Sequence, residues 1–275
     1  ALLALMRERG LDAASMEDSS HAISYHRVDG VMFDVAGFTN LTQDHLDLHG
    51  SMDEYFRTKA ELFTAGRARH AVVTVDDDWG RQLAETADIP VTTLSTKPVD
   101  GSSSSTDWKV ASITARGLGS EFELKHADGR TLRVHTGLPG DFNVANAALA
   151  TVMVLASGVD AHTLQAALDA HDPFTVAVPG RMQLVSTEPA SVVDFAHNPD
   201  ALSRALEAVR SPREGSRVIV VFGATGQRDQ GKRPTMGAIA ARLADVVIIS
   251  DDDPHDEDAA AIRAEVLQGA HAARE

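Results

Sequence analysis

The last third of the chain alternates short apolar runs with stretches of helical period, and this rhythm limits the possible folds more than any other feature. Each apolar run leads through a polar loop into an amphipathic pattern. The predicted strands are 191–195, 218–222 and 246–250, and the predicted helices are 199–209, 236–243 and 259–267. Continuous apolar strands separated by helices are typical of a parallel, doubly wound α/β sheet.

The polar loops of this region follow the carboxyl ends of the predicted strands. They span 196–198, 223–232 and 251–258. Open α/β sheets bind their ligands at this edge, so the three loops predict one site in a Rossmann-like domain.

The earlier part of the chain also mixes the two periods. We predict strands at 13–16, 28–35, 71–75, 89–94, 108–114 and 121–134, the last broken by a turn at 127–129, and helices at 1–10, 79–86, 140–156 and 162–170. Pro and Gly punctuate a change of pattern at 173–180, which favours a domain boundary there. The predicted domains are 1–177 and 178–275.

A lysine lies in the middle of a predicted apolar helix face. Ser51 and Glu54 form a capping-box pattern, and the stripe that follows consists of Met52, Tyr55, Phe56, Leu62 and Phe63. Lys59 falls within that stripe. Its amine either reaches the edge of the stripe, or is paired, shifted in pKa or chemically changed. Because Asp44, His45 and Asp47 stand nearby at a predicted strand end, we favour a functional lysine.

Three other motifs have a structural and a functional interpretation. The polar cluster Glu17-Asp18-Ser19-Ser20-His21 is either a turn with a helix cap or part of a site. Asn143 and Asn146 lie in the first turn of a predicted helix, where capping explains one and a polar ligand would explain both. Gly226–Arg233 nearly spells a phosphate-binding loop, but Arg233 stands where a Mg²⁺-ligating hydroxyl is needed, so we reject that function.

Composition excludes several classes of protein. The net charge is −15, which argues against an extended nucleic-acid surface. Hydrophobic residues make up 43%, as in globular domains, and no apolar window is long enough for a membrane span. The chain has no Cys, which fits a reducing compartment and leaves carboxylates and imidazoles as metal ligands. We expect a cytoplasmic monomer.

With these motifs in view, the chain resembles the Mur ligase family. It is most similar to the branch that adds the third amino acid to UDP-N-acetylmuramoyl-L-alanyl-D-glutamate (the MurE type). The matching segments occur in family order and are MEDSSHA (16–22), FTNLTQDHLDLHG (38–50), YFRTKAELF (55–63), GDFNVANA (140–147), VPGRMQ (178–183), VVDFAHNPDAL (192–202), VFGATGQRDQGKRPTMG (221–237) and DDDPHDED (251–258).

The resemblance implies a fold and a reaction. It implies part of a central ATPase-type domain followed by a Rossmann-like C-terminal domain. The implied reaction forms an acyl phosphate from ATP and the D-glutamate carboxylate, which the amine of the incoming amino acid then attacks. It implies a role in peptidoglycan synthesis, and hence in cell-wall biogenesis, cell shape and cell division.

The resemblance also implies site residues. Glu17, His45 and Lys59 correspond to the catalytic metal-binding group for Mg²⁺, with Lys59 as a carbamate. The ATP-binding positions correspond to Asn143, Asn146, Arg181, Asp194 and His197. Positions near the UDP-muramoyl-peptide correspond to Ser19 and Arg27, and those that receive the amino acid correspond to Arg228, Asp253 and His255.

The chain departs from the family pattern in ways that bear on activity. The family's N-terminal domain, its P-loop and its final Gly-x-Gly-His-Glu segment have no counterpart within the sequence. We therefore expect a piece of a longer enzyme that is inactive by itself. The alternatives are a truncated, non-catalytic binding module and a ligase similar to folylpolyglutamate synthetase, although several of the matching segments fit the latter less well.

One departure bears on the amino acid that is added. Relatives that take meso-diaminopimelate carry Asn-Pro-Arg where this chain has Asp253-Pro254-His255. A guanidinium pairs with a distal carboxylate through two parallel hydrogen bonds, which an imidazole cannot form. Acidic residues around His255 would also favour an ammonium group. The resemblance therefore predicts L-lysine first and L-ornithine second, with meso-diaminopimelate as the alternative because Arg228 is present.

Overall fold

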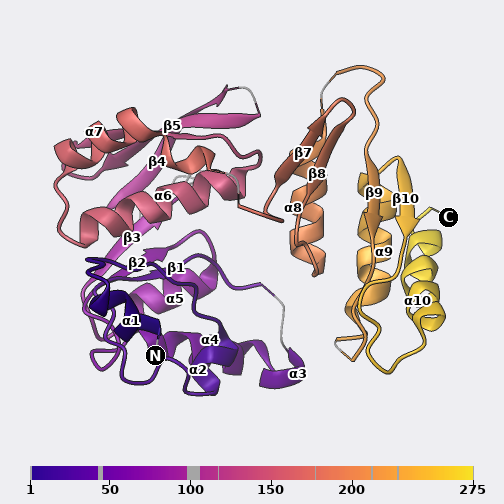
Figure 1. The fold of residues 1–275 in the computed structure, drawn as a ribbon, viewed down its shortest axis with the longest axis horizontal. Helices are drawn as coiled ribbons and strands as arrows, with labels where there is room; N and C mark the ends of the chain where they lie inside the picture. Colours follow the sequence, from indigo (N-terminus) through magenta and orange to yellow (C-terminus); the bar gives the residue numbers. More distant parts are fainter. Residues whose placement is uncertain are drawn as a thin grey trace.

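A computed structural model of the protein describes residues 2–42, 46–97, 106–116, 118–176, 178–211, 213–227 and 229–274. Within these ranges the chain forms a large sheet near the N-terminal end and two smaller sheets near the C-terminal end (Figure 1). Both parts mix helices and strands, so the predicted α/β class is confirmed.

The large sheet has six strands in chain order. They are β1 (Ala36–Phe38), β2 (Ala71–Thr74), β3 (Val91–Ser95), β4 (Trp108–Arg116), β5 (Gly119–His126) and β6 (Thr131–Thr136). The first four run parallel, whereas β5 and β6 form antiparallel pairs with their neighbours. The predicted turn at 127–129 joins β5 to β6.

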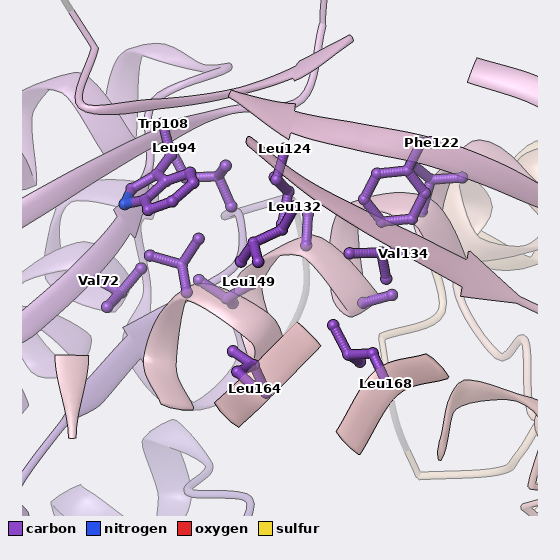
Figure 2. Packing of buried hydrophobic residues seen from close by; sticks show 14 residues of the cluster. Val72, Leu94, Trp108, Phe122, Leu124, Leu132, Val134, Leu149, Leu164 and Leu168 are labelled. Atoms are coloured by element: carbon purple, nitrogen blue, oxygen red, sulfur yellow. The ribbon is translucent and has the colours of Figure 1, made fainter. Parts of the chain in front are cut away.

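Helices cover both faces of this sheet. On one face α6 (Asp141–Ala156) and α7 (Ala161–His171) pack over a core that includes Val72, Leu94 and Trp108 (Figure 2). On the other face α4 (Met52–Ala60) and α5 (Asp78–Thr86) pack with Ala71 and Val73. Residues 71, 72 and 73 thus alternate between the two cores, as the period of a strand requires.

Several short elements connect and flank these layers. They are the helices α1 (Leu2–Glu8), α2 (Ser20–Ser24) and α3 (Leu46–His49) and the 3₁₀ turns η1 (Glu61–Phe63) and η2 (Pro173–Thr175). Leu2, Leu3 and Leu5 on α1 are exposed, and this helix buries no residue among the described parts of the chain.

Two predicted strands in the N-terminal part are wrong. Residues 13–16 form no strand and are exposed, because no neighbouring strand pairs with them. The strand predicted at 28–35 is displaced to β1, preceded by a single bridge between Phe33 and Ala68. An apolar run signals burial, but the start of a strand depends on its pairing partner.

The C-terminal part is built on the parallel pair β9 (Ile219–Phe222) and β10 (Val246–Ile249). The helices α8 (Pro199–Val209), α9 (Lys232–Leu243) and α10 (Ala259–Ala272) lie beside it. Their buried residues contact Val220, Phe222 and Val247 on one face of the sheet. The opposite face exposes Ile219, Val221, Val246 and Ile248.

The predicted strand at 191–195 belongs to another sheet. It becomes β8 (Ala190–Val193), which pairs antiparallel with β7 (Gln183–Thr187). Among the described residues, only the loops after β9 and β10 share an edge of one parallel sheet, so the prediction that loop 196–198 joins them on that edge is wrong. The boundary predicted at residue 177 stays a prediction.

Candidate active site

Lys59 lies on α4 as predicted. The helix begins at Ser51, whose hydroxyl accepts a hydrogen bond of 3.2 Å from the Glu54 amide. Tyr55 and Phe56 are buried in the core, and Lys59 is half-buried. Its amine lies 5.4 Å from the centroid of the Tyr55 ring, so the lysine packs along the apolar face of the helix.

The loop before α2 lies beside the helix that carries Lys59. Ser19 caps α2 and accepts a hydrogen bond of 3.1 Å from the Ala22 amide. The hydroxyl of the buried Ser20 lies 3.0 Å from His49 Nε2, and the His49 ring stacks on Tyr55 at 5.0 Å. His49 therefore joins the loop at 17–20 to α4.

Asp18 in that loop is the most unusual carboxylate of the region. Both of its carboxylate oxygens are buried and have no hydrogen-bond partner within the described residues. Burial raises the pKa of Asp18, and the charges of Lys59 and Arg67 oppose that shift without cancelling it. Sequence analysis named Asp18 only as a member of the polar cluster 17–21 and gave it no role of its own.

The other residues predicted near the metal and the muramoyl substrate are only partly located. Glu17 is exposed and next to Asp18. Arg27 is exposed, and its guanidinium lies 5.5 Å from the Tyr25 ring centroid. His45 and Asp44 lie outside the described residues.

The donor chemistry at this place fits Mg²⁺. In the described ranges, no three His, Cys, Asp or Glu residues are grouped so that they could hold a metal ion. Glu17 and the unpartnered Asp18 nevertheless offer the carboxylate oxygens that Mg²⁺ prefers. A carbamate on Lys59 would add another oxygen donor.

The two asparagines at the start of α6 differ in their roles. Asn143 is buried, and its amide donates a hydrogen bond of 2.7 Å to the Pro139 carbonyl. Asn146 lies on the same helix three residues later and is exposed. The expectation that one asparagine caps the helix is wrong, because the N-cap of α6 is Gly140 and no side chain caps it. A local bond to the preceding backbone satisfies Asn143 instead, and the exposed Asn146 is the better placed of the two for a ligand.

Two predicted ATP-binding residues, Arg181 and His197, contact an exposed aromatic ring, and a third, Asp194, precedes that ring in the chain. Phe195 is 63% exposed. The Arg181 guanidinium lies 4.8 Å from its ring centroid, and the His197 ring meets it edge-on at 5.1 Å. Asp194 accepts a hydrogen bond of 2.8 Å from the Met182 amide and so fixes the segment of Arg181. Sequence analysis treated Phe195 only as part of a strand; its position beside Ala196-His197-Asn198 was the available signal.

The loops after β9 and β10 contact each other closely. The Gly226 amide donates a hydrogen bond of 2.8 Å to the Asp253 carbonyl, and the Thr225 hydroxyl donates one of 3.1 Å to Asp252. A Cβ at Gly226 would collide with the Pro254 carbonyl. The predicted residue Arg228 lies outside the described residues.

Most carboxylates of the acidic loop 251–258 are engaged within the protein. Asp251 pairs with Arg263, Asp252 with Thr225, Asp256 with Gln227, Glu257 with Arg233, and Asp258 caps α10. Asp253 accepts a hydrogen bond of 3.1 Å from the His255 amide within the same turn, and its side chain is 67% exposed. The acidic loop therefore mainly stabilises the structure. Of its carboxylates, we retain Asp253 as the candidate partner for an ammonium group.

The fold and these clusters define a class: an α/β protein with a helix-covered sheet and a second parallel unit that places polar loops at the ends of its strands. Residues 1–154 match the Mur ligase middle domain, and residues 180–275 match the Mur ligase, glutamate ligase domain. The chain belongs to the Mur ligase family, which confirms the resemblance.

Individual relatives are similar over nearly the whole chain. A UDP-N-acetylmuramyl-tripeptide synthetase of Leifsonia xyli is 48% identical over 98% of this chain and 52% of its own length. A UDP-N-acetylmuramoyl-L-alanyl-D-glutamate–2,6-diaminopimelate ligase of Streptomyces avermitilis is 42% identical over the same shares. The chain thus spans about half the length of these relatives.

A solved structure supports the same assignment. The structure of a UDP-N-acetylmuramoyl-L-alanyl-D-glutamate–2,6-diaminopimelate ligase superposes with a TM-score of 0.62 at 33% identity. The superposition covers 95% of this chain and 53% of the other. In the part of this chain that the structure describes, no helix combines the length and the apolar character that crossing a membrane requires.

Proposed function

We propose that this chain is the middle and C-terminal part of an ATP-dependent ligase that adds an amino acid to UDP-N-acetylmuramoyl-L-alanyl-D-glutamate in peptidoglycan synthesis. The observation that carries the proposal is the match of both Mur ligase domains in one chain. The names of the relatives at 42% and 48% identity support this substrate. We propose a cytoplasmic reaction, because the proposed substrates are a UDP-linked peptide and ATP.

The reaction is a phosphoryl transfer followed by an acyl transfer. The γ-carboxylate of D-glutamate attacks the γ-phosphorus of ATP and releases ADP. The amine of the incoming amino acid then attacks the acyl carbon of the acyl phosphate, loses a proton, and expels inorganic phosphate. One ATP is converted to ADP and phosphate for each amide bond.

Each cluster has a role in this scheme. Arg181, Phe195 and His197 present an arginine and two rings, which suit a nucleotide base, and Asn146 adds an exposed amide. Glu17, Asp18 and a carbamate on Lys59 would hold Mg²⁺, which supplies charge neutralisation between the phosphates and the acyl group. Lys59 is half-buried and close enough to Asp18 for its charge to act on that carboxylate, so a carbamate at Lys59 would lie near the same metal ion.

We propose L-lysine as the amino acid and L-ornithine as the second choice. The support is His255, whose imidazole lacks the fork that pairs with a planar carboxylate, and Asp253, whose exposed carboxylate suits an ammonium. The relatives include both a tripeptide synthetase and 2,6-diaminopimelate ligases, so the names of the relatives leave the choice to kinetics.

Steady-state kinetics of the full-length enzyme test this proposal. Phosphate release is measured with ATP, the UDP-muramoyl-dipeptide and each of L-lysine, L-ornithine and meso-diaminopimelate. We expect the highest kcat/KM with L-lysine, by more than about tenfold, because a lost partner for a desolvated carboxylate costs roughly 2–5 kcal/mol. A preference for meso-diaminopimelate would refute the choice of lysine, and absence of turnover with any amino acid would refute the ligase function.

A further inference from the structure

We infer that the ion pair between Arg233 and Glu257 positions the incoming amino acid, because it holds the loop after β9 against the loop after β10. The inference rests on the proposed function of loops 223–231 and 251–258 as the amino-acid site. Arg233 does not belong to the set of residues predicted from the sequence. In the sequence analysis, Arg233 served only to reject a phosphate-binding loop at 226–233.

Arg233 is a fully buried cation in the first turn of α9. Its residue surface is 0% exposed, so its charge requires partners inside the protein. Nη1 donates hydrogen bonds of 2.9 Å to Glu257 and 3.0 Å to Glu265, and Nη2 donates one of 3.0 Å to Glu257. The guanidinium thus forms the two-pronged pair with Glu257 for which its geometry is suited.

Glu257 connects Arg233 to the loop after β9. It also accepts a hydrogen bond from the Gln227 amide, and the Gln227 side chain donates one of 3.0 Å to the neighbouring Asp256. Nη2 of Arg233 lies 3.4 Å from the Thr225 carbonyl in the same loop. One guanidinium and one carboxylate therefore fix both ends of the contact between the two loops.

This contact determines the conformation of the residues that would face the amino acid. Gln227 and His255 both have left-handed backbone angles, with φ of 53° and 50°. Such angles are unfavourable for residues other than glycine and persist where surrounding contacts impose them. Glu257 binds the first of these residues directly and lies two positions after the second. The contacts of Arg233 and Glu257 with the loop after β9, here called the lock, therefore hold Asp253 and His255 in a defined turn.

The second carboxylate bound to Arg233 provides a matched control. Glu265 lies on α10 and bonds to Nη1 at 3.0 Å, but no contact of Glu265 with either loop is seen in the described part of the chain. Glu257→Ala removes the link between the loops, whereas Glu265→Ala leaves it in place. Each variant leaves Arg233 with one carboxylate, although Glu257→Ala removes two of its hydrogen bonds and Glu265→Ala removes one.

Hydrogen exchange and kinetics of the two full-length variants test the inference. We expect Glu257→Ala to lose protection of the Gln227 amide and to raise the KM for the amino acid at least tenfold, with the KM for ATP unchanged. Glu265→Ala should keep that protection and change the KM for the amino acid less than threefold. Equal effects of the two variants, or no effect of Glu257→Ala on exchange, would overturn the inference.

The two readouts separate this inference from the proposed function. Amide exchange reports the lock even when no amino acid is turned over. A full-length enzyme without ligase activity but with selective loss of protection in Glu257→Ala would refute the proposed function and retain the lock. Normal exchange in Glu257→Ala together with lysine turnover would refute the lock alone.

Discussion

Two carboxylates with cationic neighbours, Asp18 and Glu257, have opposite environments in the two parts of the chain. Asp18 is buried without a hydrogen-bond partner among the described residues, and burial raises its pKa. Glu257 accepts hydrogen bonds from Arg233 and Gln227, which lower its pKa to about 2. The comparison teaches that Glu257, with its charge satisfied, maintains structure, whereas the desolvated carboxylate of Asp18 is the better candidate for binding a ligand.

Replacing Lys59, the lysine beside Asp18, should have the largest effect. In the full-length enzyme we expect Lys59→Ala to lower kcat by on the order of 10²–10³-fold, the scale of losing one electrostatic contact to the transition state. A small carboxylic acid in solution should restore part of the activity by replacing the carbamate.

Arg57→Ala on the same helix is the control, because Arg57 is exposed and pairs only with Glu54 in the described residues. Its kcat should stay within about twofold of wild type, since exposed pairs contribute little. Full activity of Lys59→Ala would show that the Asp18 region is not catalytic. It would contradict the distinction drawn between Asp18 and Glu257.

Replacing the cation beside Glu257 should reduce stability rather than chemistry. We expect Arg233→Met to lower the free energy of unfolding by about 3 kcal/mol, the lower end for a broken buried pair, because Glu257 and Glu265 are partly exposed and can be hydrated. Urea denaturation measures this change. Arg263→Met, which breaks the exposed pair with Asp251, should cost less than about 1 kcal/mol.

Acid should weaken the Glu257 contact within a defined range of pH. Its pKa is about 2 in the folded protein and 4.5 ordinarily, so its contribution is complete above pH 4.5 and is lost as the pH falls toward 2. In urea denaturation between pH 7 and pH 2.5, the difference in stability between wild type and Glu257→Gln should therefore shrink below about pH 4.5. A constant difference would contradict the assigned role of the charge.

Removing the charge of Asp18 should have the smallest effect and the opposite sign. Because burial dominates the shift of the Asp18 pKa, its charged form is disfavoured on folding at neutral pH. We expect Asp18→Asn to increase the free energy of unfolding by up to about 1 kcal/mol. In the full-length enzyme it should also weaken Mg²⁺ binding measured by calorimetry. A loss of stability would indicate that Lys59 and Arg67 already compensate the carboxylate.

Local signals predicted much of the fold. The predicted Ser51 cap of α4 is an example, since such a contact spans only three residues. The burial of β2 and the hairpin turn after β5 also follow from short sequence patterns. Pairing of β8 with β7 instead of β9 was not predictable, because strand order depends on competition between distant segments.

The candidate sites were predictable to a different degree. Matching motifs predicted Lys59, Arg181, Asp194 and His197 as site residues. The structure brings Arg181 and His197 to the Phe195 ring, while Asp194 accepts a hydrogen bond from the Met182 amide. The role of Arg233 could not be predicted from the sequence, because its partners Glu257 and Glu265 are 24 and 32 residues away. The burial of Asp18 could not be predicted either, because only the tertiary fold brings Lys59 and Arg67 near it.

The close approach of Gly226 to Pro254 has a consequence for engineering. Any side chain at position 226 would push against the backbone of the neighbouring loop. A Cβ added at Gly223 would lie only 2.8 Å from the Asp252 nitrogen. A graft that transplants only 251–258 from a ligase of different amino-acid preference would import side chains shaped for another partner loop. Residues 223–233 and 251–258 should therefore be exchanged together, as a single cassette.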